Sequence, residues 1–313
     1  MTAQASAPGR GPGALGRNDT KWALIFISPW IIGFLLMTAG PMVASLVLSF
    51  TNYDAIPMTR DSFIGLANYE QMLRDPRVWL SLQNTLFYTV LYVPISIVLG
   101  LALAMLLLRV GRLSGFFRTA FYLPTITPTV AIGALFLMLM NGQQGLVNQL
   151  LRSVGLDPPS WLNDPDWIKP AIVMMVLWTL GTTIIIFFAA LRNVPVELYD
   201  AAEVDGAGSW ARFRNVTLPF ISGAIFFVLI IHTIAALQLF DQVYAMFFGR
   251  QTTGASERSA LFYVVYVFRN AFEFQKMGYA AALAWLLFVV IMIITVIQVR
   301  TSRRWVYYQG DDR

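Results

Sequence analysis

Six long apolar segments constrain the fold of this 313-residue chain more than any other feature. None of them contains Lys, Arg, Asp or Glu, although charged residues make up 12% of the chain. Each can cross a hydrocarbon layer of about 30 Å, which takes roughly 20 helical residues. Because a charge at the centre of a spanning helix costs roughly 2.5 to 3.5 kcal/mol, the pattern predicts an all-α integral membrane protein with about six transmembrane helices. The predicted spans are 22–50, 82–108, 119–140, 170–191, 216–240 and 278–299.

The remaining composition excludes several kinds of site. The chain has no cysteine and one histidine, so we expect no disulfide, no thiolate or multi-histidine metal site and no bound metal. The net charge of +5 comes from short basic clusters between apolar segments, which argues against a nucleic-acid surface. No lysine follows a glycine, so the chain cannot form a Gly-Lys-Ser/Thr phosphate loop. Catalytic motifs are also absent from the spans, and the chain is not expected to be an enzyme.

Basic residues predict the orientation in the membrane. With the N-terminus inside, more than half of the 22 lysines and arginines fall in short cytoplasmic segments, as the positive-inside rule requires. The loop that contains Arg109, Arg112 and Arg118 has no acidic residue. The predicted organisation is a disordered cytoplasmic tail (1–20), a transmembrane domain (21–300) and a cytoplasmic C-terminal tail (301–313). Within the domain, the outer loops are 51–80, 141–169 and 241–277, and an inner loop spans 194–215.

The inner loop reads VPVELYDAAEVDGAGSWARFRN and differs in composition from everything around it. Pro195 suits the first turn of a helix, and Glu197 is favoured near the positive end of the helix dipole. Ala201 and Ala202 belong to a narrow apolar stripe, and Gly206 can end the helix in a left-handed conformation. The loop is therefore predicted to form a short helix and a turn that project from the membrane, with a second short helix over 209–213.

This loop resembles the EAA signature of binding-protein-dependent ABC importer permeases, with the spacing E-x3-A-A-x2-D-G-A followed by L-P. The similarity is greatest to the carbohydrate branch typified by maltose and glycerol-3-phosphate permeases, and extends over nearly the whole chain after the tail. Segment 247–252 departs from the turn often found there in this branch. The residues that match the signature are Glu197, Ala201, Ala202, Asp205, Gly206, Ala207, Leu218 and Pro219.

The resemblance implies a fold, a mechanism and partners. The fold is that of type I (MetI-like) importer permeases. In this family the signature loop is the coupling helix, which docks on a separate ATPase subunit, and ATP-Mg bound there drives the permease between inward-open and outward-open states. The implied partners are a second homologous permease subunit, two copies of an ABC ATPase, an extracytoplasmic solute-binding protein and membrane lipid. The implied location is a bacterial plasma membrane, and no cofactor is implied on this chain.

Polar residues inside the spans are candidates for a solute path. Hydroxyl, amide and aromatic groups would suit a sugar. Each has a packing alternative, because such side chains more often hydrogen-bond between spanning helices than bind ligand. A proton relay through the histidine would need an acidic partner inside the spans, and none is present. The candidates are Asn84, Tyr88, Trp178, Thr182, His232, Gln238 and Asp241.

Two other function classes compete with the importer permease. A self-contained secondary transporter or channel would be expected to carry an ion-coupling carboxylate inside the bilayer, and the predicted spans contain none. The third class is a polytopic membrane enzyme or assembly scaffold. It is disfavoured because the sequence contains no catalytic constellation. The sequence thus favours an ATP-driven importer permease for a sugar or related solute.

Overall fold

The structure, a computed structural model, describes residues 17–54, 62–142, 144–248 and 255–307. This part of the chain is helical and contains no strand, only a single backbone bridge between Thr51 and Phe63. The α-helices are α1 (Arg17–Phe34), α2 (Gly40–Leu48), α3 (Ala67–Arg74), α4 (Pro76–Arg109), α5 (Ser114–Tyr122), α6 (Thr129–Leu139), α7 (Leu146–Ser153), α8 (Pro165–Leu177), α9 (Gly181–Arg192), α10 (Val196–Val204), α11 (Ser209–Arg212), α12 (Leu218–Phe220), α13 (Ser222–Leu237), α14 (Asp241–Val243), α15 (Ala255–Ala260), α16 (Tyr263–Phe268) and α17 (Met277–Ser302). Short π-helical and 3-10 segments connect several of them: η1 (Leu35–Ala39), η2 (Gly111–Leu113), η3 (Leu123–Ile126), η4 (Phe213–Thr217), η5 (Tyr244–Phe248) and η6 (Arg269–Glu273).

Six segments of the described chain are long and apolar enough to span a membrane. Three are continuous helices, Lys21–Leu48, Pro76–Arg109 and Met277–Ser302. The other three are helix pairs bent by 98°, 56° and 65° at a short break: Gly111–Ile126 with Thr129–Leu139, Pro165–Leu177 with Gly181–Arg192, and Ser209–Phe220 with Ser222–Leu237. The fold class and the approximate number of spans are therefore confirmed, whereas several of the predicted span ends differ from the observed helix bounds.

Two of the three bends lie at a proline or at a closely packed glycine. Pro128 lies at the 98° break, and the preceding Thr127 is extended, as a residue before proline prefers to be. At the 56° break, Gly181 approaches another helix so closely that a β-carbon there would lie 2.4 Å from the carbonyl oxygen of Phe121. Not every proline breaks a helix, because α4 continues through Pro94. Neighbouring groups can re-satisfy the freed backbone carbonyl in such spans.

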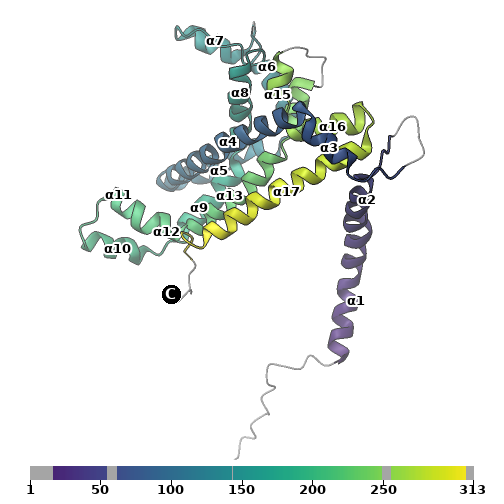
Figure 1. Cartoon of the computed structure of the whole chain (residues 1–313). Helices are drawn as coiled ribbons and strands as arrows, with labels where there is room; N and C mark the ends of the chain where they lie inside the picture. The colour runs from purple at the N-terminus through teal and green to yellow at the C-terminus, as the bar shows by residue number, and fades with distance from the viewer. Residues whose placement is uncertain (1–16, 55–61, 143, 249–254, 308–313) are drawn as a thin grey trace, which may run out of the picture.

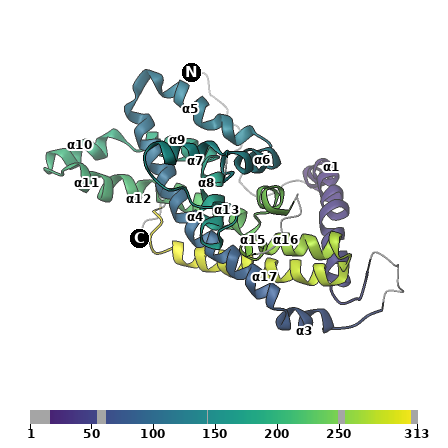
Figure 2. The same cartoon turned by 90° about the horizontal axis from the view of Figure 1, so that it is seen from above.

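The central element of the bundle is α4, which packs against α9, α13 and α16 (Figures 1 and 2). Tyr88 from α4, Phe187 from α9 and Tyr263 from α16 are fully buried in it. The apolar segment around Tyr263 is too short to span a membrane. It forms α16, which packs between α4 and α17.

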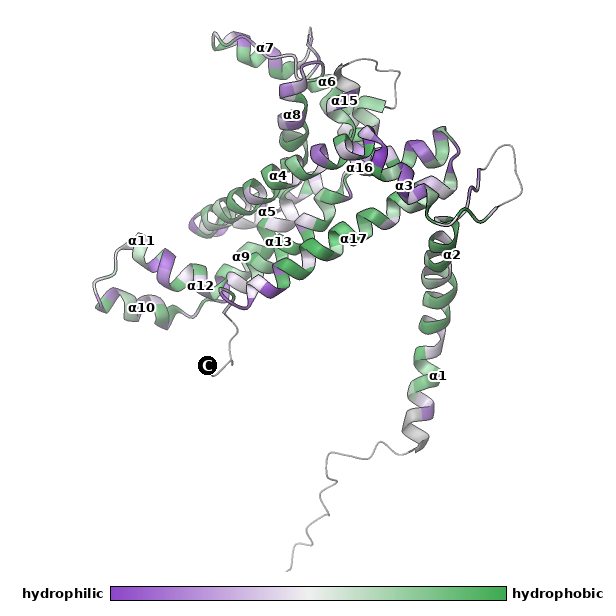
Figure 3. Cartoon of the chain, in the orientation of Figure 1, coloured by the Kyte–Doolittle hydropathy of each residue, from purple (hydrophilic) through white to green (hydrophobic). Residues whose placement is uncertain are grey.

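The first span stands away from the bundle. Figure 1 shows α1 and α2 leaving the end occupied by α3 and α16, and the most apolar window of this span is 0% buried. In Figure 3 the apolar colour runs along α2 and α17 alike, although only α17 packs against the other helices of the bundle along its length. The second half of this span, α2, packs against α17, whereas an apolar helix as exposed as α1 needs lipid or another subunit around it.

The observed helix bounds differ from the predicted segment bounds in three places. Helix α1 begins at Arg17, inside the predicted tail, and residues 1–16 lie outside the described part of the chain. Helix α4 begins at Pro76, so the end of the predicted first outer loop is helical. Helix α17 continues to Ser302, inside the predicted C-terminal tail.

Candidate functional site: a projecting hairpin and a central pocket

The hairpin begins with α10, which ends as the sequence predicts. Gly206 adopts φ +74°, its N–H donates to Glu203 O at 3.0 Å, and the N–H of Ala207 donates to Ala202 O at 2.8 Å. This pair of bonds is the Schellman motif, which satisfies the last carbonyls of a helix and favours glycine because of the left-handed backbone. Asp205 is the C-cap residue and is exposed. The predicted helix stop at Gly206 is confirmed.

The returning arm of the hairpin runs through α11, the π-helical segment Phe213–Thr217 and α12. Two contacts join the arms: Arg212 Nη1 lies 2.9 Å from Glu203 Oε2, and the hydroxyls of Tyr199 and Thr217 lie 2.9 Å apart. Nearer the bundle, side chains of both arms, including Tyr199 and Leu218, pack on the buried cluster formed by α4, α9 and α13. The hairpin is thus braced internally and anchored at its base. Pro219 lies in the first turn of α12, where its missing N–H is tolerated.

The outer surface of the hairpin is exposed and partly apolar. Glu197 and Ala201 are exposed, and Ala202 and Ala207 are half-buried. Val204 is 89% exposed and Trp210 is 71% exposed, although neither was among the predicted site residues. The sequence feature that could have identified Trp210 is the presence of a tryptophan in an otherwise polar loop. Figure 1 shows α10 and α11 projecting from the end of the bundle opposite to α3 and α16. Exposed apolar residues on such a projection are typical of a protein-binding surface.

The second feature is a cavity of about 370 Å³ between α4, α8, α13 and α14, called the central pocket below. Its lining includes three of the predicted solute-path residues, Tyr88, Gln238 and Asp241, together with Tyr92. The rings of Tyr88 and Tyr92 stack with centroids 5.4 Å apart. The buried Tyr88 hydroxyl has no hydrogen-bond partner in the described structure. The full lining is Tyr88, Tyr92, Val176, Thr179, Ala235, Ala236, Gln238, Leu239, Phe240, Asp241 and Gln242.

Asp241 joins this pocket because the chain turns back at the end of α13. Its carboxylate accepts a hydrogen bond from the Thr129 hydroxyl at 2.9 Å, which fixes it against the start of α6. Gln242, the next residue, also lines the pocket and was not predicted. Its position in the predicted outer loop gave no signal, because only the fold packs α14 against α6 and places Gln242 beside the pocket.

The other four path candidates do not line this pocket. His232 lies 3.0 Å from Ser96 Oγ through Nδ1 and 2.8 Å from Thr183 Oγ1 through Nε2, and therefore connects three helices. Asn84 is buried and donates to two backbone carbonyls near α15, as described below. Trp178 packs edge-on against a phenylalanine of α6, and Thr182 is exposed on α9. Asn84 and His232 thus have interhelical contacts of the kind set out as the packing alternative.

Comparison with known proteins identifies the family. Residues 96–307 match the family model described as binding-protein-dependent transport system inner membrane component, a range that includes the whole hairpin and α13. The chain belongs to this family. This permease is 37% identical over 298 residues to a probable ABC transporter permease protein, YesP, of Bacillus subtilis (strain 168), covering 95% of each chain. It is 34% identical to the lactose transport system permease protein LacF of Rhizobium radiobacter, covering 89% of this chain and 93% of that protein.

Solved structures agree with the fold of the permease. It superposes on a chain of a bacterial ABC transporter involved in the import of the acidic polysaccharide alginate, with a TM-score of 0.78 and 24% sequence identity. The match covers 91% of this chain and 96% of that chain. The MetI-like importer fold predicted from the signature loop is confirmed, and the chain is a membrane-spanning transporter permease.

Proposed function

We propose that this permease forms the translocation path for a sugar in an ATP-driven importer, and that the hairpin Val196–Phe220 transmits movement from separate ATPase subunits. The observation that carries the proposal is the hairpin itself. Its first helix is closed by a Schellman motif, its arms are joined at Glu203–Arg212 and Tyr199–Thr217, and its surface exposes Val204. A braced projection with an exposed apolar surface suits a lever that receives force from a partner subunit.

The proposed partners are inferred from the exposed first span and from the absence of a phosphate loop in the sequence. ATP-Mg would bind to two copies of a separate ATPase subunit, because this chain has no phosphate loop. The first span, with no burial in its most apolar window, would contact a second homologous permease subunit or lipid. A solute-binding protein would deliver the solute from outside. In this arrangement the hairpin and both termini lie in the cytoplasm of a bacterial cell.

The proposed solute class rests on the central pocket and on the relatives. The relatives carry names such as lactose transport system permease and, in Bacillus subtilis, arabinooligosaccharides transport system permease. In the central pocket, the Gln238 amide and the Asp241 carboxylate offer hydrogen-bonding groups to sugar hydroxyls, beside the stacked rings of Tyr88 and Tyr92. The cavity volume of about 370 Å³ lies within the range of small-molecule sites.

The test is reconstitution of the purified complex in proteoliposomes, with uptake of radiolabelled saccharides measured with and without internal ATP. We expect uptake only when ATP and the solute-binding protein are both present, and no effect of ionophores that dissipate ion gradients. Uptake that proceeds without ATP and collapses with an ionophore would instead support a secondary transporter.

The central pocket has its own test within the same assay. Because the Gln238 amide lines the cavity, Gln238→Ala is expected to raise the solute concentration needed for half-maximal uptake by about ten-fold, the equivalent of one lost hydrogen bond. Thr182→Ala, on a side chain outside the cavity, is the matched control and should leave that concentration unchanged.

A further inference from the structure

A larger cavity lies at the opposite end of the bundle from the hairpin. It has a volume of about 500 Å³ and is bounded by the start of α4, by α15 and α16 and by the segment that follows α16. Its apolar lining includes Leu80, Leu261 and Phe274. Three guanidinium groups, those of Arg77, Arg258 and Arg269, surround this lining, and we call the site the arginine cavity.

The arginine cavity carries excess positive charge. Among the described residues that line it, the one acidic residue is Asp75, which already accepts hydrogen bonds from the hydroxyls of Tyr266 and Tyr279 and from the Arg77 backbone N–H. Arg269 forms an ion pair with Glu273 at 2.7 Å. Arg77 and Arg258 are exposed, and within the described residues neither guanidinium has an ion-pair partner. Two cationic side chains are therefore available to an anionic group.

The backbone around this charge is held in place. Asn84 Nδ2 donates to Arg258 O at 2.8 Å and to Leu261 O at 3.1 Å, which attaches α15 and the turn after it to α4. The Arg269 guanidinium lies over the Phe274 ring, 5.4 Å from its centroid. A pre-formed site of this kind loses less conformational entropy when a partner binds.

The arginine cavity is separate from the central pocket. Arg77, Leu80, Asn84 and Tyr88 follow one another at spacings of three and four and so lie on one face of α4. Between the two cavities, Asn84 is hydrogen-bonded to Leu261 O, and the Phe262 ring packs edge-on against Tyr88 at 5.4 Å. Solute held in the central pocket therefore does not reach the arginines in this conformation.

We propose that the arginine cavity is a docking site for an acidic side chain on the solute-binding protein. The proposal rests on the proposed function, which places this end of the bundle on the outer side of the membrane. An aspartate or glutamate on the partner's surface would pair with Arg77 and Arg258, while adjoining apolar atoms cover Leu80 and Leu261. Charges at the rim of an interface accelerate association and make it dependent on salt.

The experiment uses the complete complex in nanodiscs together with the solute-binding protein that co-purifies with it. ATP hydrolysis is measured as that protein is titrated. For Arg77→Glu combined with Arg258→Glu, we expect the half-maximal concentration of binding protein to rise about ten-fold or more, with an unchanged maximal rate and a weaker dependence on salt. The double lysine variant, Arg77→Lys with Arg258→Lys, keeps the charge and should stay within about three-fold of wild type.

Arg152→Glu is the control, because Arg152 is exposed on α7 and does not line the cavity. Assembly of the complex and the hydrolysis rate without binding protein show that each variant is folded. If binding protein does not stimulate even the wild type, the proposed function fails. If it stimulates the wild type and the glutamate variant equally, only the docking site fails. An unchanged half-maximal concentration with reduced uptake of anionic solutes alone would also overturn the docking site.

Discussion

At the scale of single residues, Tyr266 shows how one hydroxyl can stabilise the end of the bundle opposite the hairpin. It donates to Asp75, the N-cap of α4, so that α16 and α4 share one carboxylate. Burial, followed by the hydrogen bond to Asp75, raises the pKa of Tyr266 from 10.0 to about 12. The folded state therefore holds this proton more tightly than the unfolded state, and the contribution to stability is complete below pH 10 and lost as pH rises through about 12.

Tyr266→Phe should consequently lower the free energy of unfolding by about 1 kcal/mol at neutral pH. The melting temperature of the purified permease, measured for both proteins in one detergent, should differ at pH 8 and converge as pH approaches 12. A difference in melting temperature that stayed constant across this pH range would show that deprotonation of the Tyr266 hydroxyl does not change the stability of the fold.

A second prediction at the scale of single residues concerns the end of α10 at Gly206. A β-carbon there would meet no atom within 4 Å, so substitution strains only the backbone at φ +74°. That strain amounts to roughly 1 to 2 kcal/mol for alanine, and less for asparagine. We expect Gly206→Ala to loosen the end of α10 and reduce the solute imported per ATP hydrolysed, with Gly206→Asn milder. Gly208→Ala is the matched control, since Gly208 has φ −66° and equal space. Normal coupling in Gly206→Ala would argue against the lever.

At the scale of elements, His232 connects α13 to α4 and α9 at one level of the bundle. Its two ring nitrogens contact Ser96 and Thr183, and its ring stacks on Tyr92 with centroids 5.5 Å apart. His232→Phe would keep the stacking and remove the hydrogen bonds. Such interhelical bonds contribute about 0.6 kcal/mol on average, so we expect a small fall in melting temperature and nearly normal uptake. Loss of uptake at unchanged melting temperature would instead assign the ring a role in transport.

The sequence could predict elements whose cause is local and not those whose cause is distant. The stop at Gly206 follows from neighbouring residues, and the spans follow from the absence of charge. At the 56° break, by contrast, Gly181 lies close to the Phe121 carbonyl, a contact with a segment distant in the chain that the residues near Gly181 do not signal. For the same reason the sequence could nominate Asn84 and Gln238 equally. Only the packing of α4 against α13 and α16 shows that one ties helices together and the other faces a cavity.

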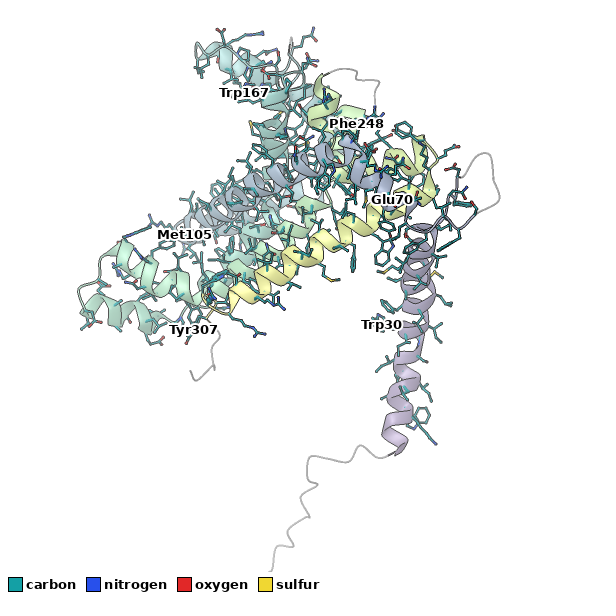
Figure 4. The ribbon with its side chains drawn as sticks, viewed as in Figure 1. Trp30, Glu70, Met105, Trp167, Phe248 and Tyr307 are labelled. Atoms are coloured by element: carbon teal, nitrogen blue, oxygen red, sulfur yellow. The ribbon has the colours of Figure 1, made fainter. Side chains whose placement is uncertain are left out.

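At the scale of the whole molecule, the separation of α1 from the bundle indicates that the chain is one part of an assembly. Trp30 on α1 is 70% exposed, and Figure 4 shows it on the projecting arm formed by α1 and α2. The hairpin exposes apolar residues at one end of the molecule, and at the other the Arg77 and Arg258 guanidiniums have no ion-pair partner among the described residues. These three surfaces suit the three surroundings proposed above: membrane or a second permease, an ATPase, and a solute-binding protein.

The assignment of these surfaces depends on which end of the bundle lies in the cytoplasm, and the chain allows a direct test. It contains no cysteine, so Ala201→Cys in the hairpin and Asp157→Cys near α7 each place one thiol on an exposed position. A maleimide that cannot cross membranes should label Asp157→Cys in intact cells, or spheroplasts if an outer membrane blocks it. It should label Ala201→Cys only after permeabilisation, because more than half of the basic residues then face the cytoplasm. Labelling of Ala201→Cys before permeabilisation would place the hairpin outside, where no ATPase could reach it.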